Sequence, residues 1–352
     1  MSLQRRDTPV FEPAVVVISL DAEQIWGYLD LFDEPRFSKR YPNVTDAYDA
    51  VLDRFCAARI KATWALVGAL TLDGMAGPGD PRLQGLPENW TAKIPAAFEV
   101  TSSVWFRRSF ARRLKQADPP QDVGLHGGLT HLVWTDPWST IDAINRELAG
   151  GIDALREISI QPRSFIFCRQ QISCLELLRP LGICCYRGNP AAQSARSESQ
   201  IPRAIHRVLE ELRRTTPPVV WPTETLPGLW NIPGSLSLYP IGRFRTSVVP
   251  MRSRIERVRR GLEAAVSCGG IFHYWFHPDT LAEGSGGLSM LDAILEILIR
   301  AREAGRIEIL TMAEVADRME SRRERPLASA YDVSGLGASL RSGTRFHNSL
   351  MA

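Results

Sequence analysis

The stretch PAVVVISLDAE, residues 13–23, predicts the fold class of this chain. Residues 14–18 form a short apolar run, which is typical of a parallel strand buried on both faces of a sheet. The run ends in polar residues. Alternate residues of a strand share a face, so Ser19 and Asp21 are predicted to point to one side at the carboxyl end of this strand, and Glu23 with them if the strand continues that far.

Similar apolar runs alternate with helical patterns along the rest of the chain. The predicted strands lie at 61–70, 122–126, 162–168, 183–188, 271–277 and 307–310, and the predicted helices at 48–60, 103–116, 140–158, 174–182, 201–214, 251–270, 288–305 and 311–323. This alternation indicates a parallel sheet. About seven such units favour a distorted (β/α)7 barrel over an open sheet.

The predicted barrel covers residues 14–320. An insertion rich in Gly, Pro, Trp and Arg follows the second strand, at about residues 71–120. Residues 321–352 are charged and then rich in Ser and Gly, which is typical of a flexible C-terminal tail.

Composition and charge limit the partners that we expect. The chain has 352 residues, of which 44% are hydrophobic, and this is ordinary for a globular protein with a real core. A net charge of +3, with no basic stripe among aromatic residues, predicts no nucleic-acid partner. The six cysteines lack metal-finger spacing, and no apolar stretch is long enough for an export signal or a membrane span. We therefore expect a cytoplasmic protein with free thiols. The sequence is also compatible with a homo-oligomer.

Polar residues follow several of the predicted strands. Acidic residues end the first strand, and His126, Arg169 and His277 end later ones. In barrels of this class the chemistry lies where strands end and loops begin. We therefore expect these side chains to converge on one rim.

The segment DVGLHGGLTHLVW, residues 122–134, contains two of the six histidines. His126 and His131 are five residues apart, which does not place them on one helical face. The intervening Gly127 and Gly128 allow a loop that folds both rings inward, where they could share a transition metal with a carboxylate. The alternative is that each histidine is an ordinary hydrogen-bonded loop residue.

Asp21 and Glu23 could have different roles at such a site. One carboxylate could bind the metal while the other acts as general base on the metal's water. The alternative for Glu23 is a helix N-cap, because an acid just after a strand often caps the next helix.

His277 and Arg169 complete the predicted rim. If 271–277 is one strand, His273 and His277 are about 13 Å apart and cannot both touch one atom. We place His277 at the rim and His273 in the core. An Arg after an apolar strand needs a partner, so Arg169 is predicted to pair with Asp21 or Glu23 and keep that acid ionised; the alternative is a solvated Arg.

Taken in order, these segments resemble the polysaccharide deacetylase superfamily, which shares the nodulation-protein-B homology domain (carbohydrate esterase family 4). The segments are SLDAE (19–23), ATWALVG (62–68), HGGLTH (126–131), FIFCRQQ (165–171), WFH (275–277) and EILTMAEVA (308–316). The resemblance covers roughly residues 14–318. It implies a distorted (β/α)7 barrel and a metal-dependent hydrolase that removes an N-acetyl or related acyl group from a sugar, as in surface polysaccharide biosynthesis.

The resemblance also implies roles for individual residues. Asp21 would be the general base, and His126 and His131 would be metal ligands. His277 would be the general acid that protonates the leaving amine, and Arg169 would orient the base. The metal would be a divalent transition ion, with zinc expected first.

This sequence departs from the family pattern at three motifs. The usual Asp-Asp pair is Asp21–Ala22 here, so same-face geometry nominates Glu23 as the third metal ligand. The alternative is that Asp21 is the ligand and another group the base. The histidine spacing is one residue longer than usual, and the arginine motif lacks its usual prolines.

Aromatic residues near the motifs suggest a carbohydrate substrate. Trp26 and Trp134 are the rings that we expect to stack on a sugar. Two other functions remain open. One is a metal-free hydrolase of the same fold that acts on a non-sugar amide, imide or formyl group; the other is a non-catalytic barrel that binds a glycan or a partner through residues 71–120.

Overall fold

Strand β1 (Ala14–Ala22) lies at the centre of the sheet and is buried along its whole length. The computed structural model describes residues 11–100, 103–189, 203–238, 249–282 and 286–324. One edge of β1 pairs in parallel with β9 (Ile271–Phe276). The other edge pairs first with β10 (Ile307–Leu310) and then, nearer the carboxyl end, with β2 (Thr63–Leu66). The buried parallel strand predicted within residues 13–23 is confirmed.

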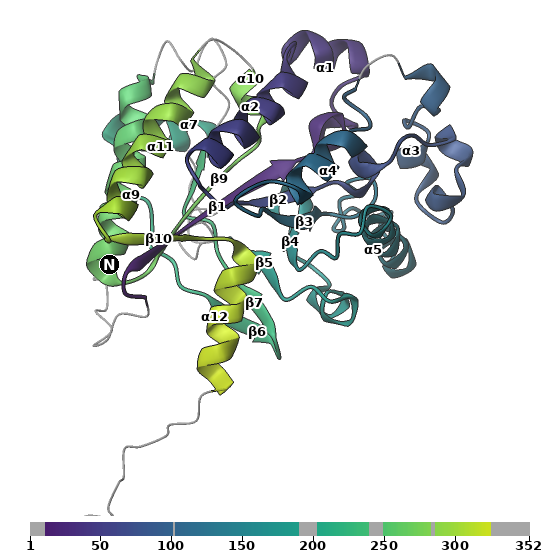
Figure 1. Cartoon of the computed structure of the whole chain (residues 1–352). Coiled ribbons are helices and arrows are strands. Elements are labelled where there is room, and N and C mark those ends of the chain that lie inside the picture. Colours follow the sequence, from purple (N-terminus) through teal and green to yellow (C-terminus); the bar gives the residue numbers. More distant parts are fainter. Residues whose placement is uncertain (1–10, 101–102, 190–202, 239–248, 283–285, 325–352) are drawn as a thin grey trace, which may run out of the picture.

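Parallel pairing continues from β2 around the molecule. The next strands are β3 (Asp122–His126), β4 (Ser164–Ile166) and β5 (Cys185–Arg187). One short segment connects β5 with β9. Its strand β7 (Leu229–Asn231) pairs with β5, and its strand β8 (Leu236–Leu238) pairs with β9. The sheet therefore curls into a distorted barrel, as the sequence predicts (Figure 1).

Every strand predicted from an apolar run is present, whereas β6 (Thr223–Leu226), β7 and β8 were not predicted. These three strands have three or four residues each, and β6 is largely exposed and pairs antiparallel with β7. Strands this short carry too few residues for a two-residue period to show. Their place is decided by the hydrogen bonds that they make to β5 and β9.

Helices surround the sheet, and α2, α11 and α9 lie side by side on one flank (Figure 1). The helices are α1 (Glu34–Arg40), α2 (Val44–Ala57), α3 (Glu88–Thr91), α4 (Arg108–Lys115), α5 (Ile141–Arg156), α7 (Arg203–Arg213), α9 (Met251–Cys268), α10 (Asp279–Ala282), α11 (Gly287–Glu303) and α12 (Met312–Glu324). Each longer helix buries an apolar stripe; in α2 this stripe is Val44, Ala47, Tyr48, Val51, Leu52 and Phe55. The predicted helix at 174–182 is instead two 3-10 turns, Leu175–Leu177 and Arg179–Leu181.

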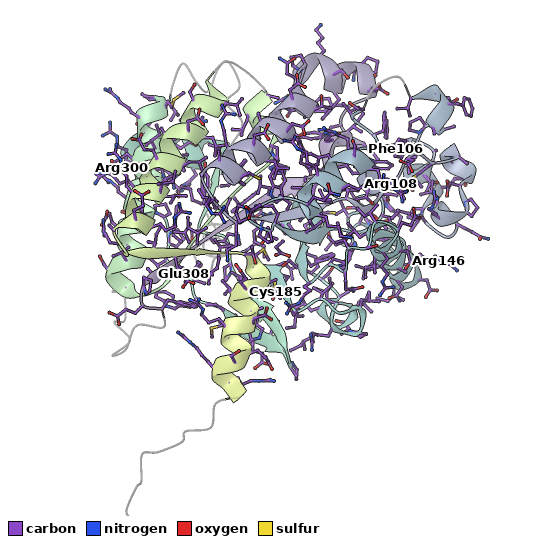
Figure 2. All side chains as sticks on the ribbon, in the orientation of Figure 1. Phe106, Arg108, Arg146, Cys185, Arg300 and Glu308 are labelled. Carbon is purple, nitrogen blue, oxygen red and sulfur yellow. The ribbon has the colours of Figure 1, made fainter. Side chains whose placement is uncertain are left out.

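The segment between β2 and β3 packs into the main core. It consists of short 3-10 turns with α3 and α4, and Trp90, Trp105 and Phe110 are buried against the barrel. Side chains fill the space between the sheet and its surrounding helices (Figure 2). No helix of the described residues is long and apolar enough to cross a membrane. Helix α12 runs through Glu324, and the rest of the predicted tail lies outside the described residues.

Candidate active site

The carboxyl ends of the strands surround a cavity of about 220 Å³. Six of the residues singled out above line it: Asp21, Glu23, His126, His131, Arg169 and His277. They come from the ends of β1, β3, β4 and β9, where parallel strands present their last residues to one rim. The structure thus brings the predicted residues together.

Glu23 is the carboxylate around which three imidazoles gather. Its Oε2 lies 2.9 Å from Nε2 of His126 and 3.0 Å from Nε2 of His131. Its Oε1 lies 3.2 Å from Nε2 of His277. Glu23 does occupy the N-cap position of the 3-10 turn Gln24–Tyr28, but its side chain makes no capping hydrogen bond. The alternative role as a helix cap therefore does not account for this side chain.

Gly27 leaves the space that the Glu23 carboxylate occupies. A Cβ at this position would lie 2.1 Å from Cδ of Glu23, far inside van der Waals contact. A side chain at residue 27 would therefore push the carboxylate away from the histidines.

His126 is the last residue of β3, and its ring has a defined tautomer. Its Nδ1 lies 3.0 Å from the carbonyl oxygen of Ile166. A carbonyl can only accept, so Nδ1 carries the hydrogen and donates it, and Nε2 of the neutral ring keeps its lone pair. That lone pair faces a Glu23 oxygen at 2.9 Å. Two acceptors this close need a proton or a cation between them.

His131 lies opposite His126, with ring centroids 4.8 Å apart. It is buried, and burial lowers the pKa of its ring more than Glu23 raises it, which favours the neutral form. Neither ring nitrogen makes a well-formed hydrogen bond within the described part of the chain. Buried nitrogens without well-formed hydrogen bonds are rare, and a pair of imidazoles beside a carboxylate fits a metal site.

The Gly-Gly pair makes room for two buried side chains beneath the histidine loop. A Cβ on Gly127, whose φ is +71°, would lie 2.1 Å from Sγ of Cys168. A Cβ on Gly128 would lie 2.4 Å from Cγ of Glu147. Glu147, on α5, accepts hydrogen bonds from the backbone N–H groups of Thr130 (2.6 Å) and Leu132 (3.0 Å). It thereby holds the loop on both sides of His131.

The arginine that pairs with Asp21 is Arg187, and the predicted pairing of Arg169 with Asp21 or Glu23 is wrong. Arg187 ends β5, and its Nη1 and Nη2 donate to the two Asp21 oxygens at 2.5 and 2.7 Å. Arg169 has a φ of +53° and donates instead to Asp30 at 2.5 and 2.7 Å, where both side chains are about one-third exposed. The backbone at residue 169 carries its side chain to the cavity mouth, whereas β5 directs Arg187 into the barrel.

Arg187 is held by a second set of contacts deeper in the barrel. Its Nη1 also donates to Oγ of Ser19 at 3.1 Å, and its guanidinium lies 4.1 Å from the ring centroid of Trp275. Oγ of Ser19 lies 2.8 Å from Nε2 of His273. Burial, followed by the charge of Arg187, lowers the pKa of His273 to about 3, so this ring is neutral. The prediction that His273 is a satisfied core residue is confirmed.

Solved structures show what this arrangement resembles. A protein described as a polysaccharide deacetylase from Mycobacterium smegmatis aligns over 94% of this chain and 98% of its own, with a TM-score of 0.57 and 14% identity. One from Pseudomonas aeruginosa aligns over 91% and 97%, with a TM-score of 0.54 and 9% identity. This chain has the polysaccharide deacetylase fold.

An allantoinase shares the same deacetylase fold. It aligns over 93% of this chain and 100% of its own, with a TM-score of 0.56 and 9% identity. No protein-family model matches the sequence, and a comparison with curated proteins found no match. At identities this low, structural similarity establishes the fold alone. The chemistry therefore has to be argued from the site.

The charges at the centre of this deacetylase fold are strongly coupled. Burial raises the pKa of Asp21, but Arg187 outweighs it and the net value is lowered. Burial likewise raises the pKa of Glu23, but His277 and His131 bring it well below the ordinary range. Burial lowers the pKa of His277, but Glu23 and Asp21 raise it to about 9. Without a bound cation, both carboxylates are therefore ionised at neutral pH and His277 is protonated.

Trp26 and Trp134 do not lie where a sugar could reach them. Trp26 is fully buried, donates from Nε1 to the carbonyl oxygen of Trp105 at 2.7 Å and packs edge-on against that ring. Trp134 is buried against Phe165 and Phe167. The placement of both rings argues against the predicted stacking role, because their faces are covered by the core.

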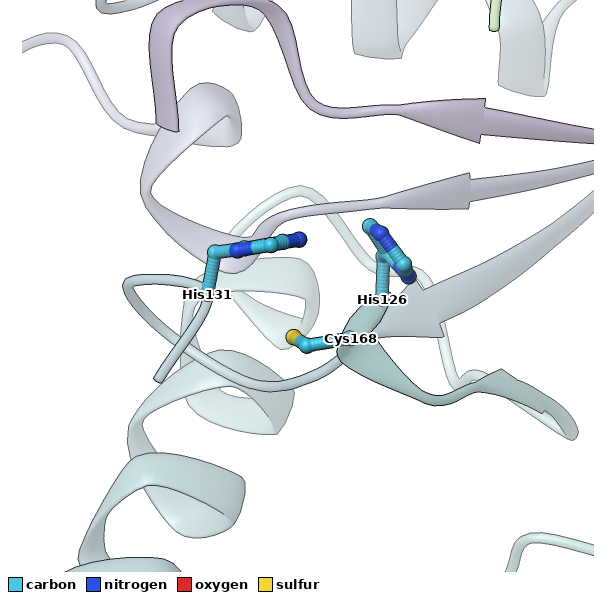
Figure 3. A group of neighbouring side chains, drawn as sticks. All are labelled: His126, His131 and Cys168. Carbon is cyan, nitrogen blue, oxygen red and sulfur yellow. The ribbon is translucent and has the colours of Figure 1, made fainter. Parts of the chain in front are cut away.

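Cys168 and Arg187 are residues of the site that were not predicted. Sγ of Cys168 and one ring nitrogen each of His126 and His131 all lie within 4.8 Å of one another (Figure 3). The signals were present: Cys168 immediately precedes Arg169, and Arg187 ends the predicted strand at 183–188. Like Arg169, Arg187 follows an apolar run and therefore needs a partner.

Proposed function

We propose that this protein is a metal-dependent hydrolase that removes an N-acetyl or related acyl group from a sugar. The observation that carries this proposal is the contact of one carboxylate, Glu23, with His126 and His131 at 2.9 and 3.0 Å on the wall of the cavity. His277 and the Arg187–Asp21 pair lie beside it.

The residues around Glu23 fit a divalent transition metal. Two imidazoles and one carboxylate are a donor set that zinc binds while keeping a position open for water or substrate. Nε2 of His126 faces a carboxylate oxygen at 2.9 Å, and a cation between the two atoms would satisfy this contact. A bound ion of this kind would polarise the acyl oxygen and lower the pKa of water toward 7.

The side chains beside this metal site have different roles in the hydrolysis. Asp21 accepts the proton of the water that adds to the acyl carbon, and Arg187 holds the Asp21 carboxylate in place. His277, whose side chain is 27% exposed and lies 3.6 Å from Asp21, donates a proton to the leaving nitrogen. The C–N bond breaks, and the products are a carboxylic acid and an amine. Arg169 lines the cavity mouth and is placed to contact the substrate.

The second candidate is a metal-free hydrolase that cleaves a C–N bond in a non-sugar amide. It is favoured by the allantoinase, whose TM-score equals that of the deacetylases to within a few hundredths. For either activity we propose the cytoplasm as the location, because all six cysteines are free and a reducing compartment keeps them so.

Elemental analysis of the protein, purified without chelator, tests the proposal first. His126→Ala and Glu23→Gln are the test variants, and His206→Ala, in α7 and outside the cavity, is the matched control. Near-stoichiometric metal in the parent and control, lost in the test variants, would support the site.

Release of acetate from N-acetylated sugars is the second measurement, made on the same samples with added zinc. Turnover that follows metal content supports the deacetylase. Amide hydrolysis in protein that takes up no zinc, cobalt or nickel would favour the metal-free hydrolase. Absence of any turnover would favour the non-catalytic barrel.

A further inference from the structure

Cys168 is buried directly beneath the histidine loop. Cys168 is 4% exposed, and its sulfur occupies the space that a side chain at residue 127 would fill. The sulfur and one ring nitrogen each of His126 and His131 lie within 4.8 Å of one another (Figure 3). Three potential metal donors, from the end of β3, the loop after it and the turn after β4, thus lie close together.

The poor hydrogen bonding of His131, whose Nε2 lies 3.0 Å from Oε2 of Glu23 without a well-formed hydrogen bond, independently points to a ligand at this position. Its side chain is 3% exposed, and neither of its ring nitrogens makes a well-formed hydrogen bond with any residue in the described ranges. A buried imidazole whose nitrogens lack well-formed hydrogen bonds costs free energy unless something else occupies its lone pair. A metal between His126, His131 and Cys168 would do so.

We propose that Cys168 is a further ligand of the metal that His126 and His131 hold. This inference rests on the proposed function, because it concerns the same metal. Among three atoms that are at most 4.8 Å apart there is always a point within about 2.8 Å of all three, against about 2.0–2.3 Å for zinc bound to nitrogen or sulfur. Side-chain shifts of about 0.5–0.8 Å would therefore complete the contact.

A sulfur ligand predicts which ions the site prefers. Thiolate with imidazole favours zinc or cobalt over magnesium or manganese, which prefer oxygen donors.

Cobalt titration of the full-length, metal-free protein tests the inference. Cobalt bound by thiolate gives a charge-transfer band in the near ultraviolet, a readout that does not depend on activity. Cys168→Ser is the test variant. Cys174→Ser is the matched control, since Cys174 is partly buried and lies outside the His126–His131–Cys168 group. Thermal unfolding of each metal-free protein checks that the variants fold.

The parent and Cys174→Ser are expected to show the thiolate band, and Cys168→Ser is expected to lose it and to bind zinc at least about tenfold more weakly. Cobalt bound to the parent without a thiolate band, and with the same affinity in Cys168→Ser, would overturn the role of Cys168 while leaving the histidine site intact. Failure of the parent to bind cobalt would overturn both proposals. So would binding that His126→Ala does not weaken.

Discussion

Arg187 and Asp21 form a two-pronged ion pair across the interior of the barrel, with side chains 2% and 4% exposed. Removing one partner of a buried pair leaves an uncompensated charge. We expect Arg187→Ala to lower the free energy of unfolding by about 3–5 kcal/mol, measured by urea denaturation. Arg169→Ala is the control, because the Arg169–Asp30 pair is partly exposed and should contribute at most about 1 kcal/mol. Equal losses in the two variants would contradict this account.

Asp21→Asn separates the two roles that the sequence left open for this residue. Asn keeps an acceptor for Arg187 but cannot take a proton. If Asp21 is the general base, hydrolysis should fall by about 10²–10⁴-fold while the metal content stays that of the parent. Acetate release and elemental analysis on the same preparation distinguish the outcomes. Loss of metal together with activity would make Asp21 a ligand instead.

His277→Ala should slow the cleavage of amides much more than that of esters. An amine leaves poorly without a proton, whereas an alkoxide leaves more readily, so a general acid matters more for the amide. The measurement is kcat/KM for matched N-acetyl and O-acetyl substrates of the parent and the variant. A uniform decrease on both substrates would remove His277 from the leaving-group step.

The acid stability of the protein should depend on His273. Its pKa is about 3 in the folded protein and ordinarily 6.5, so between these values the unfolded chain binds a proton that the folded chain does not. Stability is therefore lost as the pH falls from 6.5 toward 3, by up to about 1.4 kcal/mol per pH unit from this group. His273→Asn does not titrate, and its unfolding free energy should fall less steeply over this range. Parallel pH profiles for the two proteins would argue against a neutral buried His273.

Gly127→Ala tests whether the glycine makes room for Cys168. Gly127 and Gly305 have similar φ values, +71° and +68°, but a Cβ at Gly305 meets nothing within 4 Å. Gly305→Ala should therefore cost only the conformational strain of about 1–2 kcal/mol. Gly127→Ala should cost about 1–3 kcal/mol more, because the new Cβ overlaps the Cys168 sulfur. Urea denaturation gives both values, and similar values would mean that the sulfur moves aside freely.

Sequence reasoning located the rim of the site because of one property of parallel sheets. Their strands all deliver their last residues to the same edge, so apolar runs ending in polar residues identify side chains that meet. Asp21, Glu23, His126, His131 and His277 line one cavity for this reason. Glu23 lies beside the histidines as predicted, although β1 ends at Ala22 and Glu23 itself has helical backbone angles, so the alternation of a strand does not place it there.

The ion-pair partner of an arginine could not be predicted from the sequence, because it depends on the direction in which the side chain points from the barrel wall. Arg169 and Arg187 both end apolar strands, and nothing local distinguishes them. The positive φ at Arg169 sends its side chain to Asp30, while Arg187 lies one strand further along and reaches Asp21. Trp26 was misplaced for a similar reason, since its cover comes from the segment between β2 and β3.

The sequence by itself therefore determined which polar residues end the parallel strands, and hence which of them lie at the rim. The periodicity of strands and the parallel connection of βα units suffice for this, and both are local properties. The tertiary structure alone decided which arginine neutralises Asp21 and brought the Cys168 sulfur under the histidines. Those contacts depend on packing between segments far apart in the chain, which no local pattern encodes.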